Sequence, residues 1–178
     1  MRRLSVILSC AALGFELYVE LLGEAVAELS GERRPAARPV RVDATVNAHV
    51  PATYIEAEAL KIDLHRRLAL TDSEDELREL RAATEDRYGP LPEPVENLFT
   101  IQESKLKLAR VGADYLVFRG GKTTVGPLLL GSDELRALRA EVDTAVYTSA
   151  RREVSLRDEN FSGATRLVAA ILGARQAA

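Results

Sequence analysis

Hydrophobic and polar positions along this chain follow helical spacing in most segments. The first such segment covers residues 14–30, where apolar side chains recur every three or four positions and glutamates occupy the opposite side. Gly31 suits the end of that helix, and a stretch rich in arginine, proline and alanine follows over residues 32–39. We therefore predict an N-terminal helical extension over residues 1–31, a linker over 32–39 and a separate domain over 40–178.

Strand spacing is confined to a few short segments. Apolar and polar residues alternate over residues 40–48, and Pro51 stops the pattern. Two further pairs of alternating segments flank Gly120-Gly121 and residues 150–152, and each of these short connections is typical of a hairpin turn. The pattern thus predicts one early strand and two later hairpins.

Three consecutive helices are predicted between the first strand and the first hairpin. Helical spacing covers residues 55–70, and Asp72-Ser73 is a typical N-cap signal for a second helix, which Gly89-Pro90 ends. A third helix is expected over residues 94–111, because proline is tolerated in a first helical turn and Gly112 suits the end.

Two shorter helical patterns complete the chain, one beginning at Ser132 and one over residues 161–172. Hairpins in place of regular strand–helix alternation indicate the α+β class. We expect helices packed on a small antiparallel or mixed sheet that is built largely from hairpins.

Composition and charge narrow the possible partners. The chain has 178 residues, 47% of them hydrophobic and 29% charged, which is typical of a globular protein with a buried core. Its net charge of -3 gives no general attraction for phosphate backbones, so nucleic-acid binding would need a local patch. The arginines from Arg33 to Arg41 in the linker are a candidate patch, which leaves a nucleic-acid accessory module as one alternative function. We expect DNA binding to be weak at most.

The N-terminus contains a pattern that competes with a cytoplasmic location. A basic start, a short apolar run over residues 4–8 and Ser9-Cys10 resemble a bacterial lipoprotein cleavage site. The apolar run is shorter than the roughly 7–15 residues of a signal sequence, and no stretch is long enough to span a membrane. The single cysteine excludes an internal disulfide and suits a reducing compartment. We expect a cytoplasmic protein, with an exported lipoprotein-type adaptor anchored at Cys10 as the alternative.

The motifs of common enzyme classes are incomplete in this sequence. Gly121-Lys122-Thr123 resembles the end of a phosphate-binding loop, but Leu116 stands where that loop requires its first glycine. His49 and His65 have no histidine or cysteine at ligand spacing, so a metal site is not expected. The acidic residues of 74–87 alternate with arginines, as on a solvated ion-pair face. We therefore expect no catalysis, cofactor or metal.

Two stretches are distinctive when they occur together in this order. They are Val50-Pro51-Ala52-Thr53-Tyr54-Ile55 with Leu64-His65-Arg66-Arg67-Leu68-Ala69, and Asp86-Arg87-Tyr88-Gly89-Pro90-Leu91-Pro92-Glu93-Pro94-Val95-Glu96-Asn97-Leu98. In type and spacing they resemble the C-terminal regulatory domain of the bacterial transcription-repair coupling factor, a superfamily 2 helicase-like DNA translocase. The segment Gly14-Phe15-Glu16-Leu17-Tyr18 resembles the end of that family's motor region, whereas residues 1–13 do not fit.

The resemblance implies a regulatory role. In the family, this domain docks on the N-terminal module that recruits the excision-repair damage-recognition ATPase, and it masks that module. Acidic residues on the helix before the Gly-Pro turn face arginines of the partner module. Asp86 matches the acidic position, and the other candidate partner-binding residues are Glu79, Glu85 and Arg87. Ala83 stands where the family often has glutamate.

The implied partners are therefore proteins. The first is the recruitment module, an intramolecular partner in the parent protein, and excision-repair proteins are further candidates. Residues 1–31 would be the tail of a motor region, and their apolar stripe over residues 14–30 is also a candidate for self-association.

Overall fold

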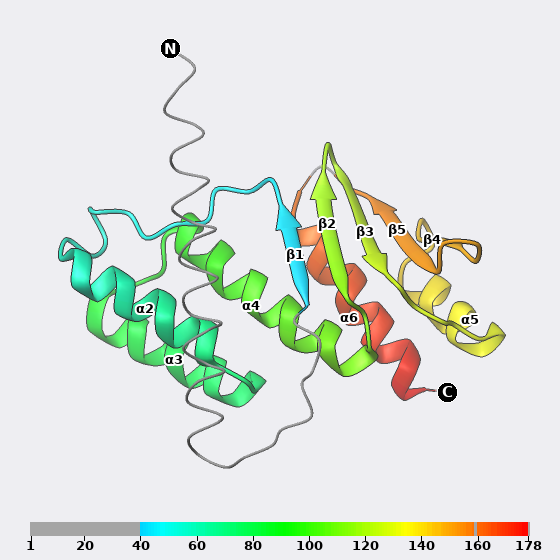
Figure 1. Ribbon diagram of the computed structural model, residues 1–178, viewed down its shortest axis with the longest axis horizontal. Coiled ribbons are helices and arrows are strands. Elements are labelled where there is room, and N and C mark those ends of the chain that lie inside the picture. The colour runs from blue at the N-terminus through cyan, green and yellow to red at the C-terminus, as the bar shows by residue number, and fades with distance from the viewer. Residues whose placement is uncertain (1–39, 159, 178) are drawn as a thin grey trace.

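The computed structural model describes residues 40–158 and 160–177 (Figure 1). The predicted helix over residues 14–30 and the predicted extension and linker lie outside these residues. Helices and one sheet make up the described part, and the α+β class is confirmed. The helices are α2 (Glu58–Leu70), α3 (Glu74–Tyr88), α4 (Glu93–Val111), α5 (Ser132–Glu141) and α6 (Ser162–Gln176).

The sheet has five strands in the order β1-β2-β3-β5-β4. Only the contact between β1 and β2 is parallel, and the other neighbours are antiparallel, so the sheet is mixed and both predicted hairpins are present. Gly120 and Gly121 have φ of 56° and 67° in the first hairpin turn, a conformation that favours glycine. The strands are β1 (Arg41–Ala44), β2 (Tyr115–Arg119), β3 (Lys122–Gly126), β4 (Val146–Thr148) and β5 (Glu153–Arg157).

The first strand is shorter than its sequence pattern predicts. Alternation continues to residue 48, but β1 ends at Ala44. Ala44 pairs with Phe118, the Thr45 amide donates to the Phe118 carbonyl, and β2 ends one residue later at Arg119. Among the described strands, residues 46–48 therefore have no neighbour to pair with, because β2 turns back into β3.

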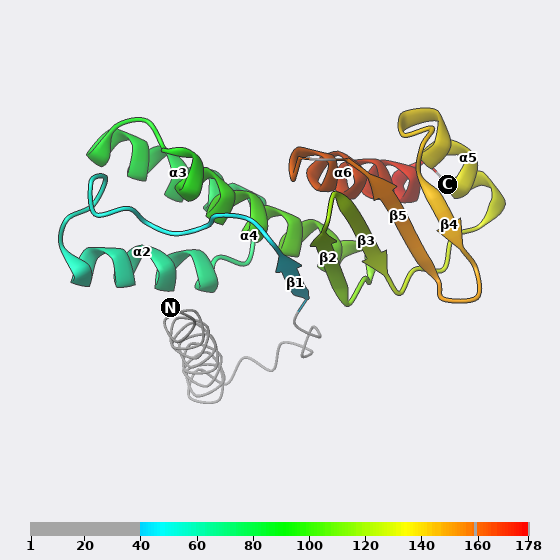
Figure 2. The same cartoon turned by 90° about the horizontal axis from the view of Figure 1, so that it is seen from above.

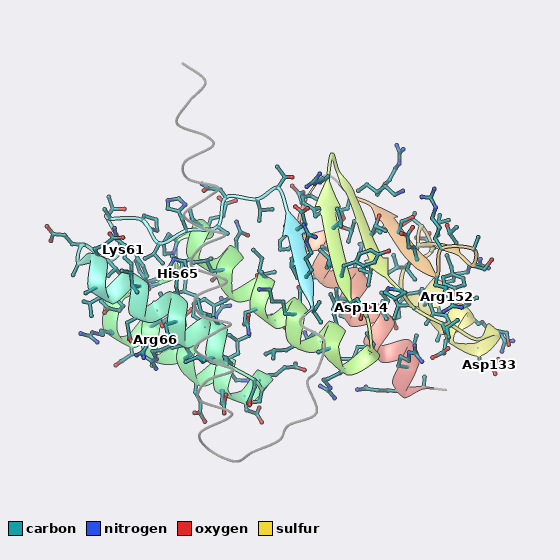
Figure 3. All side chains as sticks on the ribbon, viewed as in Figure 1. Lys61, His65, Arg66, Asp114, Asp133 and Arg152 are labelled. Carbon is teal, nitrogen blue, oxygen red and sulfur yellow. The ribbon has the colours of Figure 1, made fainter. Side chains whose placement is uncertain are left out.

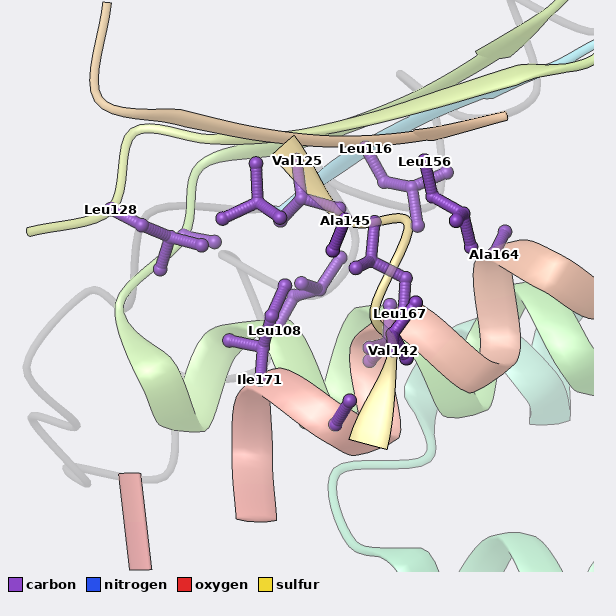
Figure 4. Close-up of a cluster of buried hydrophobic side chains, with 14 of the residues drawn as sticks. Leu108, Leu116, Val125, Leu128, Val142, Ala145, Leu156, Ala164, Leu167 and Ile171 are labelled. Atoms are coloured by element: carbon purple, nitrogen blue, oxygen red, sulfur yellow. The ribbon is translucent and has the colours of Figure 1, made fainter. Parts of the chain in front are cut away.

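Buried side chains form two hydrophobic clusters that α4 connects. Its N-terminal half contributes Val95 and Phe99 to a cluster with α2 and α3, and its C-terminal half contributes Leu108 and Val111 to a larger cluster under the sheet. In the larger cluster, sheet residues meet α4 and α6, as Figure 4 shows for Leu108, Leu116, Val125, Leu156, Leu167 and Ile171. One helix of 19 residues thus belongs to both cores.

The helices that pack on the sheet lie on one of its faces. α6 contacts β3 and β5, α4 contacts β1, and α5 packs on α6. Figure 2 shows these helices on the same side of the sheet, while the pair of α2 and α3 lies at the other end of the molecule. In the described part of the chain, no helix is long and apolar enough to cross a membrane.

Candidate protein-interaction surface

Helix α3 carries all four of the predicted partner-binding residues, and its N-terminal end forms as the sequence predicts. The Ser73 side chain caps the helix by accepting a hydrogen bond of 3.2 Å from the Glu76 amide. Leu77, Leu80 and Thr84 are buried, and the Thr84 hydroxyl donates to the Leu80 carbonyl at 2.7 Å. This buried stripe sets the orientation of the helix, so the opposite side faces solvent.

The C-terminal end of α3 is joined to the extended segment that precedes α2. The Tyr54 hydroxyl donates to the Gly89 carbonyl at 2.8 Å, and the rings of Tyr54 and Tyr88 lie 5.9 Å apart. Gly89 has φ of 86° and ψ of -173°, and its amide donates to the Glu85 carbonyl. The two distinctive stretches of the sequence therefore meet at this point, and together they determine where the helix ends.

The electrostatics of this junction favour the hydrogen bond. Burial raises the pKa of Tyr54, and the nearby carboxylate of Glu85 raises it further. A raised pKa keeps the phenol protonated, and only the protonated phenol can donate to the Gly89 carbonyl.

An arginine on α3 binds carboxylates on both α3 and α4. The Arg81 guanidinium forms an ion pair with Glu96, contacts Glu85 at 3.4 Å, and lies 5.9 Å from the centre of the Phe99 ring. These contacts fix α3 against α4. Glu85, one of the predicted partner-binding residues, is thus already engaged within the domain.

The remaining predicted residues lie on the exposed part of α3. Glu79 and Asp86 are both exposed, seven residues apart, which places them on one face about 10 Å apart along the helix axis. Ala83 is exposed between them. We call Glu79, Ala83 and Asp86 the acidic stripe. Arg87 is exposed beside it, with its guanidinium 5.2 Å from the centre of the Tyr88 ring.

The acidic stripe has unused charge. Within residues 40–158 and 160–177, neither Glu79 nor Asp86 forms an ion pair. By contrast, Asp75 on the same helix pairs with Arg78 at 2.8 Å. A cationic partner could therefore bind both carboxylates of the stripe without first breaking an ion pair to another described residue.

Sequence reasoning did not single out the residues that support the stripe. Tyr54 and Glu96 are parts of the distinctive stretches but have no role assigned from the sequence, and Arg81 belongs to the helix expected to be a solvated ion-pair face. The sequence signal for Tyr54 is its place in the first distinctive stretch, which occurs in this chain together with the second stretch and its Gly-Pro turn. The pairing of Arg81 with Glu96 joins two helices, and periodicity along one helix carries no signal for it.

Other candidate chemistry is dispersed over the domain. Figure 3 shows His65 on α2 with Lys61 and Arg66, far from Asp133 and Arg152 at the other end of the molecule. Burial lowers the pKa of His65, and the charge of Glu58 opposes this effect. Among the residues that the structure describes, no group of three or more histidine, cysteine or acidic side chains is arranged to hold a metal ion.

Comparison with known families identifies the region that contains α3. Residues 44–126 match the model of the TRCF domain, and this range includes all of α2, α3 and α4. The chain carries a TRCF domain. Its curated relatives include the transcription-repair-coupling factor of Mycobacterium bovis, which is 31% identical over 171 residues, a match that covers 88% of this chain and 14% of the relative.

Two further matches agree with this TRCF domain assignment. The transcription-repair-coupling factor of Bacillus subtilis is 34% identical over 96 residues, which cover 53% of this chain and 8% of that protein. A crystal structure of the C-terminal domain of a transcription-repair coupling factor has the same fold. It superposes with a TM-score of 0.67 at 20% identity and covers 78% of this chain and 95% of the solved chain. The chain thus spans only a small part of its full-length relatives.

Proposed function

We propose that this TRCF domain is a non-catalytic regulatory domain of a cytoplasmic DNA-repair factor. In this proposal the acidic stripe docks on the N-terminal module that recruits the excision-repair damage-recognition ATPase, and the docked domain masks that module. The observation that carries the proposal is the pair of exposed carboxylates of Glu79 and Asp86, which form no ion pair within the described residues. They lie in the segment that matches the TRCF domain.

The rigidity of α3 supports a role in docking. The Tyr54–Gly89 hydrogen bond holds the C-terminal end of the helix, and the Arg81–Glu96 ion pair holds its side. A partner therefore meets a helix whose position is already determined, and little conformational entropy is lost on binding. The small side chain of Ala83 lets a partner side chain approach the helix backbone between the two carboxylates.

The energetic weight of Asp86 depends on how deeply the partner covers it. An ion pair at the rim of an interface contributes about 0–1 kcal/mol, whereas breaking a buried pair by removing one charge costs about 2–5 kcal/mol. Ala83 removes one carboxylate from the arrangement that the family often has, so Asp86 and Glu79 carry the interaction here.

Isothermal titration calorimetry of this chain into the purified recruitment module of a coupling factor from the same organism tests the proposal. Asp86→Arg is expected to weaken binding at least tenfold, because it places a cation against the partner's arginines. The matched control is Glu141→Arg, which makes the same change of charge at an exposed position on α5. Unchanged affinity for Asp86→Arg, or equal loss in both variants, would reject the acidic stripe as the docking surface.

Absence of heat up to several hundred micromolar would reject docking of the separate domain. A single protein in which a flexible linker joins the module to this chain then distinguishes weak docking from none, because a tether supplies an effective concentration in the millimolar range. Docking in the joined protein is measured by NMR, as a change in the chemical shifts of α3 relative to the separate domain. The Asp86→Arg variant is expected to remove this change.

A further inference from the structure

Three basic side chains lie side by side at one end of the sheet. Strand register places Arg119 of β2 opposite Lys122 of β3, and Lys122 opposite Arg157 of β5. All three residues are exposed, and they alternate with buried Phe118, Thr123 and Leu156. They therefore point away from α4 and α6, on the face of the sheet that those helices leave open (Figure 2). We call Arg119, Lys122 and Arg157 the basic row.

This arrangement is not one that favours the stability of the sheet. Like charges directly opposite each other on neighbouring strands repel, and the basic row contains two such pairs. Arg119 forms an ion pair with Asp43 on β1 at 2.6 Å. Lys122 and Arg157 form none within residues 40–158 and 160–177. Two cations are thus held together without a neutralising partner among the residues that the structure describes.

The surroundings of the basic row permit close approach by an extended anion. Gly120 and Gly121 form the adjacent turn, and they add no side chains beside the row. Asp158, whose amide donates to the Gly121 carbonyl, faces Arg166 at 3.7 Å. The next row of the same face carries the hydroxyls of Thr124 and Ser155, which are paired in register.

We propose that the basic row binds the phosphodiester backbone of a nucleic-acid strand. Neighbouring strands are about 4.8 Å apart, so the row spans about 10 Å, and a DNA strand carries one charge per about 3.4 Å of helix axis. The row is therefore about as long as three charge spacings of a strand. Arginine suits phosphate because its planar guanidinium makes paired hydrogen bonds, and hydroxyl groups of serine and threonine commonly add contacts to the backbone.

The surface is separate from the acidic stripe. The basic row lies on the sheet, whereas α3 lies at one end of the long axis, away from the sheet (Figure 1). Backbone contacts of this kind do not read sequence, so the interaction is independent of base identity and sensitive to salt. Binding is weak for a site of this size, and it adds to whatever the rest of a longer protein contributes.

Fluorescence anisotropy of a labelled single-stranded DNA of about 20 nucleotides, titrated with the full chain at several salt concentrations, tests the proposal. The variant Lys122→Gln with Arg157→Gln is expected to bind at least fivefold more weakly at low salt. Its slope of log affinity against log salt is expected to be smaller by about 1.4, since each phosphate contact to a single strand contributes about 0.7. Its melting temperature is expected to be unchanged or higher, because both like-charge pairs are gone.

The matched control is Arg136→Gln with Arg139→Gln, which removes the same charge from exposed positions on α5. The control is expected to bind like the unmodified chain. An equal loss of DNA affinity in both variants would mean that binding depends only on the total charge of the chain, and it would overturn the proposal. Lack of binding by the unmodified chain at low salt would overturn it as well. A third result would also overturn it: a polyglutamate peptide that displaces the labelled DNA as well as unlabelled oligonucleotide does at equal charge. The row would then bind acidic polymers without preference for phosphate.

Discussion

The hydroxyl of Tyr54 donates a hydrogen bond of 2.8 Å to the carbonyl of Gly89, 35 residues later in the chain. This bond joins the segment before α2 to the last turn of α3, where Asp86 is exposed. The two stretches by which the sequence resembles coupling factors are therefore parts of one structural unit. The unit determines where α3 ends and how its acidic stripe is presented.

Removing the Tyr54 hydroxyl tests this unit. Tyr54→Phe keeps the ring contact with Tyr88 but leaves the Gly89 carbonyl without that donor, so we expect the free energy of unfolding to fall by about 1 kcal/mol. Urea denaturation followed by circular dichroism measures the change. Tyr147→Phe removes a hydroxyl that donates to the Leu128 carbonyl at 3.0 Å, outside this unit. Only Tyr54→Phe should also increase hydrogen exchange in the last turn of α3, and equal exchange in both variants would contradict the role assigned to Tyr54.

The backbone conformation of Gly89 predicts that a side chain at this position destabilises the domain. Its φ of 86° with ψ of -173° is a conformation that residues with a side chain rarely adopt, so Gly89→Ala is expected to destabilise the domain by about 1–3 kcal/mol. Gly173→Ala is the control, because Gly173 is inside α6 with open space around it, and alanine favours helix by about 0.5–1 kcal/mol. The two variants should shift the thermal midpoint in opposite directions. A Gly89→Ala protein as stable as the parent would show that α3 tolerates another ending.

Tyr115, on the open face of the sheet, is expected to make the stability of the domain fall at alkaline pH. Burial and a hydrogen bond of 2.6 Å to the Glu153 carboxylate raise the pKa of Tyr115 from 10.0 to about 12. The unfolded chain ionises this phenol first, so the stability that it contributes is complete below about pH 10 and is lost as the pH rises through about 12. Stability measured between these values should fall less steeply for Tyr115→Phe than for the parent chain. Parallel curves would contradict the assignment.

Two buried threonines, Thr123 and Thr84, allow the free-energy cost of a buried hydroxyl without a hydrogen bond to be measured. Thr123 is fully buried and its hydroxyl has no hydrogen-bond partner among the described residues, whereas the hydroxyl of Thr84 donates to the Leu80 carbonyl. Replacing a hydroxyl by a methyl group of similar size removes the desolvation cost at Thr123, so Thr123→Val should stabilise the domain by about 1 kcal/mol. Thr84→Val should destabilise it. Chemical denaturation of both variants measures the difference, and the same sign for both would refute the argument.

Much of the helical structure follows from local signals in the sequence. Ser73 caps α3 and Gly112 ends α4 with φ of 73°, both at the predicted positions. The hairpin turn at Gly120-Gly121 was equally predictable, because two consecutive residues with positive φ strongly favour glycine. The acidic stripe is another local consequence, since residues seven apart share a helix face whatever surrounds the helix.

The sequence by itself therefore determined the order of the helices and hairpins and the face of α3 that carries Glu79 and Asp86, whereas the end of β1 at Ala44 depends on its neighbour β2. Only the tertiary structure decided which carboxylates remain available and which strands become neighbours. Glu85 is engaged because Arg81 lies within reach of both α3 and α4, and the basic row exists because β3 pairs with β2 on one side and β5 on the other. Periodicity encodes the direction of a side chain within its own element, whereas contacts between elements depend on how the two cores pack around α4.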